Sequence, residues 1–203
     1  MKKPIIYTVG HSTHPIEYFI TLLKQHGVNC IVDVRSLAAS RFNPQYNKKS
    51  LNASLEQHEI KYFHFAEPFG ARQTDPDFLN ETGQVDFKKI RASDKFGKGI
   101  MSLKELARQG NIISLMCAEG EPLDCHRFLM ISPALTDFEV KHILKENRVV
   151  TQSQLEEKLL KSYSKKKAVP DMFHKGGTVQ KELDDAYEFC SKKIAYSPQR
   201  VKK

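Results

Sequence analysis

Short apolar runs alternate with amphipathic segments along most of the chain, and this alternation predicts the order of strands and helices. The run IIYTV at positions 5–9 is rich in β-branched residues and stops at GHS. The segment that follows spaces its apolar residues, from Ile16 to Leu23, along one face of a helix. The run NCIVDV at positions 29–34 is apolar on both alternating faces, as in a strand inside a parallel sheet. The chain therefore opens as strand, helix and buried strand.

The same pattern continues toward the C-terminus. We expect strands at 61–65, 112–118 and 139–144, and helices at 48–60, 100–110, 151–163 and 178–194. A further helix is expected from about Asp124, interrupted near Pro133. Residues 66–97 hold several turn signals and only a weak helical pattern, which is typical of a lid, a binding loop or a less ordered insertion.

Strands that alternate with helices predict a mainly parallel sheet covered on both faces. This is an α/β fold, an open three-layer sandwich with a Rossmann-like sheet. We expect one core domain over residues 1–160 and a basic C-terminal extension over residues 161–203 that contains one helix. In this architecture functional groups gather beyond the carboxyl ends of the strands. The loops GHSTHP, RSLAASRFNPQYN and AEGEPLDCHR follow predicted strands, so they are expected to form one site.

The first loop offers His11 and Ser12 directly after Gly10, which permits a close backbone approach. An imidazole here would titrate near neutral pH or bind a metal. The structural alternative is that Ser12 or its neighbour caps the following helix and that His11 bonds to an adjacent loop. The sequence leaves both interpretations open.

The second loop is dense in hydrogen-bond donors. Arg35 and Arg41 suit a phosphate or a carboxylate, because the planar guanidinium makes bidentate charge-assisted bonds, and Ser40 adds a hydroxyl. Asp33 lies near the end of an otherwise apolar strand, where a carboxylate without a partner is costly. It is expected to form an ion pair with Arg35 or Arg127, and it would then orient an arginine toward the anion.

The third loop carries Cys117, Cys125, His126 and Arg127. Eight residues separate the two cysteines, which fits neither the C-x-x-C of a redox centre nor a usual zinc knuckle. A rhodanese-type or phosphatase-type cradle requires an arginine six residues after the cysteine, and Leu123 stands there. The start of a helix after the loop would favour a thiolate or a bound anion at Cys125.

Three interpretations of these side chains remain open. Cys125 or Cys117 would be a nucleophile with His11 or His126 as its base. A metal would be held by Cys117, Cys125, His126 and His11. The thiols would otherwise be small buried hydrophobic groups, which is the interpretation that we favour for the remaining two cysteines, Cys30 and Cys190.

Composition narrows the cellular context. Four cysteines in 203 residues are too few for a disulfide scaffold, and no apolar stretch near the start is long enough for an export signal or a membrane span. We therefore expect a cytoplasmic protein with free thiols and no membrane partner. Residues 161–203 hold eleven Lys or Arg and five Asp or Glu, so they supply most of the net charge of +8. They would contact an acidic partner or form a solvated surface, and the second interpretation is favoured.

Five motifs in order are similar to a known family. They are TVGHST, VDVRSLAASRFNPQYNKKSL, KYFHFAEPFGAR, LMCAEGEPLDCHR and VKHIL, and together they resemble the domain of unknown function 488 family over about residues 5–160. The resemblance implies a compact α/β domain of prokaryotic type and no particular reaction. It also implies a site at Gly10, His11, Ser12, Asp33, Arg35, Ser40, Arg41, Cys117, Glu119, Cys125, His126 and Arg127. The chain departs from the family pattern at Ala38, where a proline is usual, and at Ala71, where a glycine is common.

The leading hypothesis is an enzyme that acts on a phosphate-bearing substrate, such as a nucleotide or nucleic acid. The arginines of the second loop, Arg72 and Arg127 would hold the anion, and His11, Cys125 or Glu119 would supply proton transfer or covalent chemistry. One alternative is a non-catalytic module that binds nucleic acid or a protein through an anion pocket and the basic tail. Another is a thiol and histidine metal-binding protein. The sequence defines neither a cofactor nor an oligomeric state.

Overall fold

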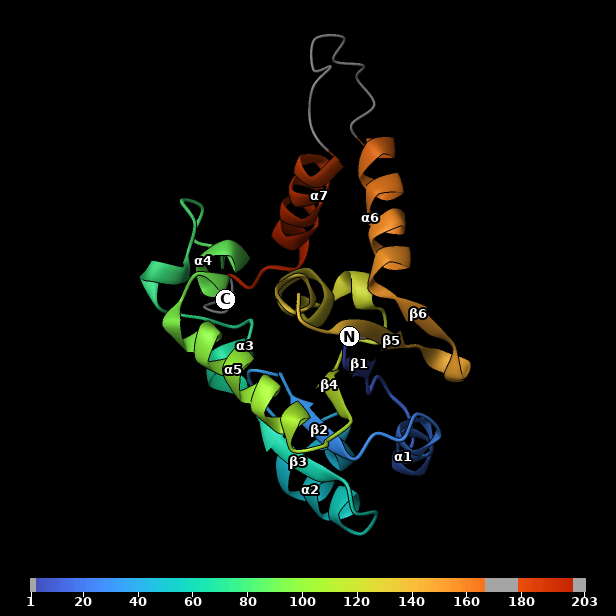
Figure 1. The fold of residues 1–203 in the computed structure, drawn as a ribbon. Helices are drawn as coiled ribbons and strands as arrows, with labels where there is room; N and C mark the ends of the chain where they lie inside the picture. The colour runs from blue at the N-terminus through green and yellow to red at the C-terminus, as the bar shows by residue number, and fades with distance from the viewer. Residues whose placement is uncertain (1–2, 167–178, 199–203) are drawn as a thin grey trace.

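The computed structural model describes residues 3–166 and 179–198, and it has a single six-stranded sheet in that part of the chain (Figure 1). The strands lie in the order β3-β2-β4-β1-β5-β6, of which β6 alone is antiparallel to its neighbour. Their bounds are β1 Ile5–Gly10, β2 Cys30–Asp33, β3 Lys61–His64, β4 Ile113–Cys117, β5 Glu139–Ile143 and β6 Val149–Thr151. The predicted three-layer α/β sandwich with a mainly parallel sheet is confirmed.

Alternate residues of the central strands face two separate helical layers. Ile31 of β2 and Met116 of β4 pack in one layer, which is formed with α1 (Ile16–Gln25) and α2 (Lys48–Glu56). Val32 and Leu115, one position along each strand, pack in the other, which contains α5 (Asp94–Arg108). Because both faces are covered, the strands are apolar at consecutive positions rather than at every second one.

The C-terminal helices pack on the same face as α5. Helix α6 (Gln152–Lys166) follows β6 directly, and α7 (Val179–Ile194) lies beside it in Figure 1. The ring of Tyr187 on α7 lies 5.5 Å from that of Phe128, and its hydroxyl accepts a hydrogen bond from Gln152 at 2.6 Å. Part of the basic extension, for which the sequence suggested contacts to an acidic partner, lies outside the described residues, at 167–178 and 199–203.

The expected insertion is shorter and more ordered than its sequence suggests. It contains α3 (Ala66–Phe69), a 3-10 helix (Pro76–Phe78) and α4 (Phe87–Arg91), and α5 begins at Asp94 rather than at residue 100. Ser93 caps α5 by accepting a hydrogen bond from the amide of Phe96 at 3.2 Å. Two glycines in the first turns of α5 hide this start. One of them, Gly99, is needed, because a Cβ there would lie 2.6 Å from Pro68.

The segment between β4 and β5 contains no regular α-helix, although one was expected from about Asp124. The segment contains a 3-10 turn at Pro122–Asp124, a π-helix at Arg127–Ile131 and another 3-10 turn at Ser132–Ala134. Between the first two, Cys125 has an extended backbone with φ −135° and ψ 142°. Pro122 and Pro133 explain part of this departure from a regular helix, since each lacks the backbone N–H that a helical hydrogen bond requires. Among the described residues, no helix has both the length and the hydrophobicity of a membrane span.

Candidate functional site

The loops after β1 and β4 are joined backbone to backbone at the carboxyl edge of the sheet. The amides of His11 and Ser12 donate to the carbonyl oxygens of Cys117 and Ala118, each at 2.9 Å. Ser12 adopts a left-handed φ of 48°. A Cβ on Gly10 would lie 1.8 Å from the carbonyl oxygen of Glu119, so only glycine allows this approach. The sheet therefore fixes the two loops relative to each other.

A cavity of about 710 Å³ lies beyond these loops. It brings together most of the side chains selected from the sequence, namely His11, Ser12, Arg35, Ser40, Arg72, Cys117, Glu119, Cys125 and His126. Asp33, Arg41 and Arg127 are not among its lining residues. Arg41 is exposed on the loop outside the cavity, whereas the other two are buried next to it and support lining residues. We call this cavity the strand-end pocket.

Asp33 and Arg35 form a buried ion pair on one side of the strand-end pocket. Nε of Arg35 donates to Oδ1 of Asp33 at 2.9 Å, and Nη2 donates to Oδ2 at 2.6 Å. Nη2 also donates to the carbonyl oxygen of Tyr46, and the hydroxyl of Tyr62 donates to Asp33 at 2.8 Å. Burial would lower the pKa of Arg35, but its bonds to Asp33 outweigh that effect and raise it. The guanidinium is therefore charged and fixed in orientation.

His11 is held as a neutral imidazole. Its Nδ1 donates to the carbonyl oxygen of Ser12 at 2.8 Å, which leaves Nε2 to accept from Nη1 of Arg35 at 3.2 Å. Its ring stacks on Tyr46 with 4.0 Å between centroids. Burial, followed by the charge of Arg35, lowers the pKa of His11 to about 4. His11 is therefore a weak base in this arrangement, and its Nε2 is already occupied.

Cys117, Cys125 and His126 form a compact cluster at the floor of the pocket. Nδ1 of His126 lies 3.7 Å from Sγ of Cys117 and 3.8 Å from Sγ of Cys125. Nε2 of His126 donates to the carbonyl oxygen of Val34 at 2.9 Å, so the lone pair or proton on Nδ1 points at the sulfurs. The thiols are nearly buried, with exposed fractions of 5% for Cys117 and 1% for Cys125.

The surroundings shift the pKa values of the two thiols in opposite directions. Burial opposes ionisation of Cys125, but a hydrogen bond from Cys117 and the charges of Arg127 and His126 hold the pKa of Cys125 well below its usual value. The hydrogen bond to Cys125, together with burial, raises the pKa of Cys117. From the sequence, the N-terminus of a helix was expected to favour the thiolate of Cys125. The five-residue π-helix is too short for that explanation, and the neighbouring side chains replace it.

Arg127 is fully buried behind the loop that carries Glu119. Its Nη1 donates to the carbonyl oxygen of Glu119 and its Nη2 to that of Gly120, the latter at 2.8 Å. Its Nε has no hydrogen-bond partner among the described residues. A buried guanidinium without a carboxylate partner favours negative charge nearby, and the thiol of Cys125 is in a position to carry it. Arg127 thus holds the loop of Glu119 and Gly120 in place and favours the thiolate of Cys125, although it does not line the pocket itself.

Several lining residues were not expected from the sequence. Tyr196, after α7, lies with its ring 5.9 Å from the guanidinium carbon of Arg72, and its carbonyl oxygen accepts from the amide of Val85. Phe42 also lines the pocket and is 94% exposed. An aromatic residue in a polar loop was a usable signal for Phe42. Nothing in the local sequence around Tyr196 indicated that it returns to the strand ends.

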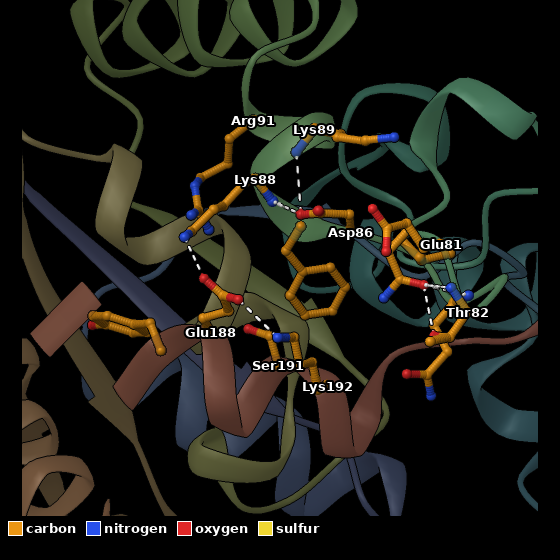
Figure 2. A pocket seen from close by; sticks show the side chains of 14 residues that line it. Glu81, Thr82, Asp86, Lys88, Lys89, Arg91, Glu188, Ser191 and Lys192 are labelled. Atoms are coloured by element: carbon orange, nitrogen blue, oxygen red, sulfur yellow. Dashed lines mark hydrogen bonds and ion pairs between the residues drawn. The ribbon is translucent and has the colours of Figure 1, made fainter. Parts of the chain in front are cut away.

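A second cavity of about 590 Å³ lies between α4 and α7 (Figure 2). Its basic side chains are largely engaged: Lys88 and Lys192 both contact Glu188, as the dashed lines in Figure 2 show. Lys89 donates to the carbonyl oxygen of Leu79 at 2.6 Å. Its lining residues include neither cysteine nor histidine. The strand-end pocket is therefore the better candidate for chemistry.

Fold and pocket together define the class of protein: an open, mainly parallel α/β protein with cysteine, histidine and arginine side chains gathered beyond its strand ends. A family model described as "Domain of unknown function DUF488" matches residues 15–132, which is more than half of the chain. The chain belongs to this family. No curated protein and no solved structure matches it. The matched range includes Arg35, Cys117 and Cys125, whereas His11 and Tyr196 lie outside it.

Proposed function

We propose that this chain is an enzyme that acts on a phosphate-bearing substrate of nucleotide size in the strand-end pocket. The observation that carries the proposal is the convergence of two unlike sets of groups on one cavity. Donors suited to an anion lie on one wall, and the Cys125 and His126 pair lies at the floor. Binding groups and reactive groups beside each other are the arrangement that a catalytic site requires.

Arg35 is suited to hold the anionic group. Its bonds to Asp33, Tyr46 and His11 leave one N–H of Nη1 without a hydrogen-bond partner in the described part of the chain, and Arg35 lines the pocket. An arginine fixed by its own carboxylate loses little side-chain entropy on binding. The exposed guanidinium of Arg72 and the hydroxyl of Ser12 line the same pocket and extend this set of donors.

Size and aromatic content favour a nucleotide as the substrate. A volume of about 710 Å³ lies within the range of about 300–1,000 Å³ that is usual for small-molecule sites. Phe42 and Tyr196 contribute aromatic rings to the lining. An aromatic ring can stack on any nucleobase, whichever base the nucleotide carries. The phosphate would then bind toward Arg35 and the base toward the two aromatic side chains.

Two exposed arginines provide a matched test of substrate binding. Arg72 lines the pocket, and Arg41 lies on the adjacent loop outside it. Calorimetric titration of nucleoside monophosphates and diphosphates into the full chain should yield a Kd that rises about tenfold in Arg72→Gln. This corresponds to about 1.4 kcal/mol, close to the lower end of the range of about 1.5–3 kcal/mol for a hydrogen bond to a charged group. Arg41→Gln should bind as the wild type does.

Turnover is tested with Cys125→Ser. The wild-type protein and this variant are incubated with the same nucleotides, and products are separated by chromatography. A nucleotide consumed by the wild type should persist with Cys125→Ser. Cys190→Ser, which changes a thiol on α7 that does not line the pocket, should retain activity. Equal affinity in the two arginine variants, or turnover that survives in Cys125→Ser, would contradict the proposal.

A further inference from the structure

The floor of the strand-end pocket has the donor atoms of a metal centre. Sγ of Cys117, Sγ of Cys125 and Nδ1 of His126 all lie within 4.8 Å of one another, and all three residues are buried. They come from two elements, the end of β4 and the segment after the 3-10 turn. Two soft thiolates and an imidazole are ligands that favour zinc over magnesium or calcium.

The two sulfur-to-nitrogen distances match tetrahedral coordination. Zinc binds thiolate sulfur at about 2.3 Å and imidazole nitrogen at about 2.0–2.1 Å, so a tetrahedron requires about 3.6 Å between sulfur and nitrogen. The structure has 3.7 Å from Cys117 to His126 and 3.8 Å from Cys125 to His126. Only small side-chain movements would therefore be needed to bind an ion.

The surroundings of the donors also fit a metal centre. The bond from Nε2 of His126 to the carbonyl oxygen of Val34, at 2.9 Å, presents Nδ1 as the ligand atom. Such an outer hydrogen bond is the usual support of a metal-binding histidine. The buried charge of Arg127, which lies directly after His126, helps to balance a centre that contains two thiolates.

The geometry points to a zinc-type site at Cys117, Cys125 and His126 whose fourth coordination position opens into the strand-end pocket. All three ligands line that pocket, as do the carboxylates of Glu119 and Asp124. Three protein ligands with an open position are typical of catalytic rather than structural zinc. The inference deepens the proposed function and rests on it for its catalytic meaning. The binding of the metal, however, is measured without substrate.

Cobalt substitution tests the ligand set. The full chain is purified without an affinity tag, treated with a chelator under reducing conditions and titrated with Co²⁺ alone. The wild type should bind one equivalent and show a thiolate-to-cobalt charge-transfer absorption. Cys117→Ser and Cys125→Ser should each weaken Co²⁺ binding by more than about 100-fold, since losing only a group that hydrogen-bonds to a ligand costs about 10–100-fold. Cys190→Ser, a thiol outside the cluster, should bind as the wild type does.

X-ray absorption of the zinc-loaded wild type tests the same ligands without any variant, in case a serine variant does not fold. The spectrum should fit two sulfur atoms at about 2.3 Å and lighter atoms at about 2.0–2.1 Å. A shell without sulfur, or failure to bind a stoichiometric metal, would overturn the inference. So would a cobalt spectrum that Cys190→Ser abolishes as completely as Cys125→Ser.

The two proposals fail in different ways. If the wild type binds no stoichiometric metal but binds and turns over nucleotides, the metal inference is wrong and the proposed function stands. If the expected cobalt spectrum is observed but neither form binds a nucleotide, the metal site stands and the proposed substrate is wrong.

Discussion

Acidification should destabilise the protein through His142, which is fully buried on β5. Its Nε2 donates to Oε1 of Gln152 at 2.9 Å, because the amide nitrogen of Gln152 already donates to Tyr187 and Glu156. Its Nδ1 therefore accepts from the hydroxyl of Thr8 at 2.8 Å. The neutral form satisfies both ring nitrogens, whereas protonation would bury a charge and require the Thr8 hydroxyl to turn from donor to acceptor.

The sign and size of the effect follow from this burial. Burial lowers the pKa of His142 from 6.5 to about 4. Below pH 6.5 the unfolded chain therefore binds a proton that the folded chain excludes, and stability falls with pH until the folded chain is protonated near pH 4. At about 1.4 kcal/mol per pH unit, the loss of stability is about 2 kcal/mol at pH 5 and about 3.5 kcal/mol once the folded chain is fully protonated. The lowered pKa of His11 acts in the same direction.

Urea unfolding at pH 7.5 and pH 5 measures this effect. The free energy of unfolding of the wild type should fall by at least about 2 kcal/mol between these values. His142→Gln will be less stable at both, but its loss between them should be about 2 kcal/mol smaller, because the titrating group is gone. His58→Gln, which removes an exposed histidine, should keep the wild-type dependence. The reasoning is refuted if His142→Gln and the wild type lose the same free energy.

Three further predictions concern packing and metal. Gly10→Ala should lower the free energy of unfolding in urea by at least about 3 kcal/mol, because its Cβ would meet the carbonyl oxygen of Glu119. Gly97→Ala, which has open space around it in α5, should raise the free energy of unfolding by about 0.5–1 kcal/mol. Equal effects of the two changes would contradict the backbone contact between the loops. Tyr187→Phe should lose about 1–2 kcal/mol, because the hydroxyl joins Gln152 to Glu156, and an unchanged unfolding midpoint would exclude that role. Zinc should raise the Tm of the wild type but not that of Cys117→Ser, as scanning calorimetry would detect.

The layer structure could be predicted because strands buried on both faces leave a direct record in the sequence. The consecutive apolar residues at 30–32 identified β2, and the carboxyl ends of the strands then indicated which loops would meet. Strand β6 was missed because its three residues, Val149–Thr151, are too few to show a period. The start of α5 was missed because Gly97 and Gly99 obscure the helical pattern.

The arrangement of the site was only partly predictable. The eight-residue spacing of Cys117 and Cys125 matches no motif, and their approach depends on the turn at Pro122–Asp124 and the extended backbone of Cys125. The ion pair of Asp33 with Arg35 was one of two alternatives, and the structure has this one. Tyr46 under His11 and Tyr196 beside Arg72 are tertiary contacts between distant segments, which no local pattern records.

A crystal structure grown with a non-hydrolysable nucleotide analogue would test the proposed function most directly. The proposal predicts the analogue in the strand-end pocket, with a phosphate oxygen about 2.7–2.9 Å from Nη1 of Arg35. Its base should lie toward Phe42 and Tyr196. An analogue bound in the cavity between α4 and α7, or a strand-end pocket that contains only water at saturating concentration, would contradict it.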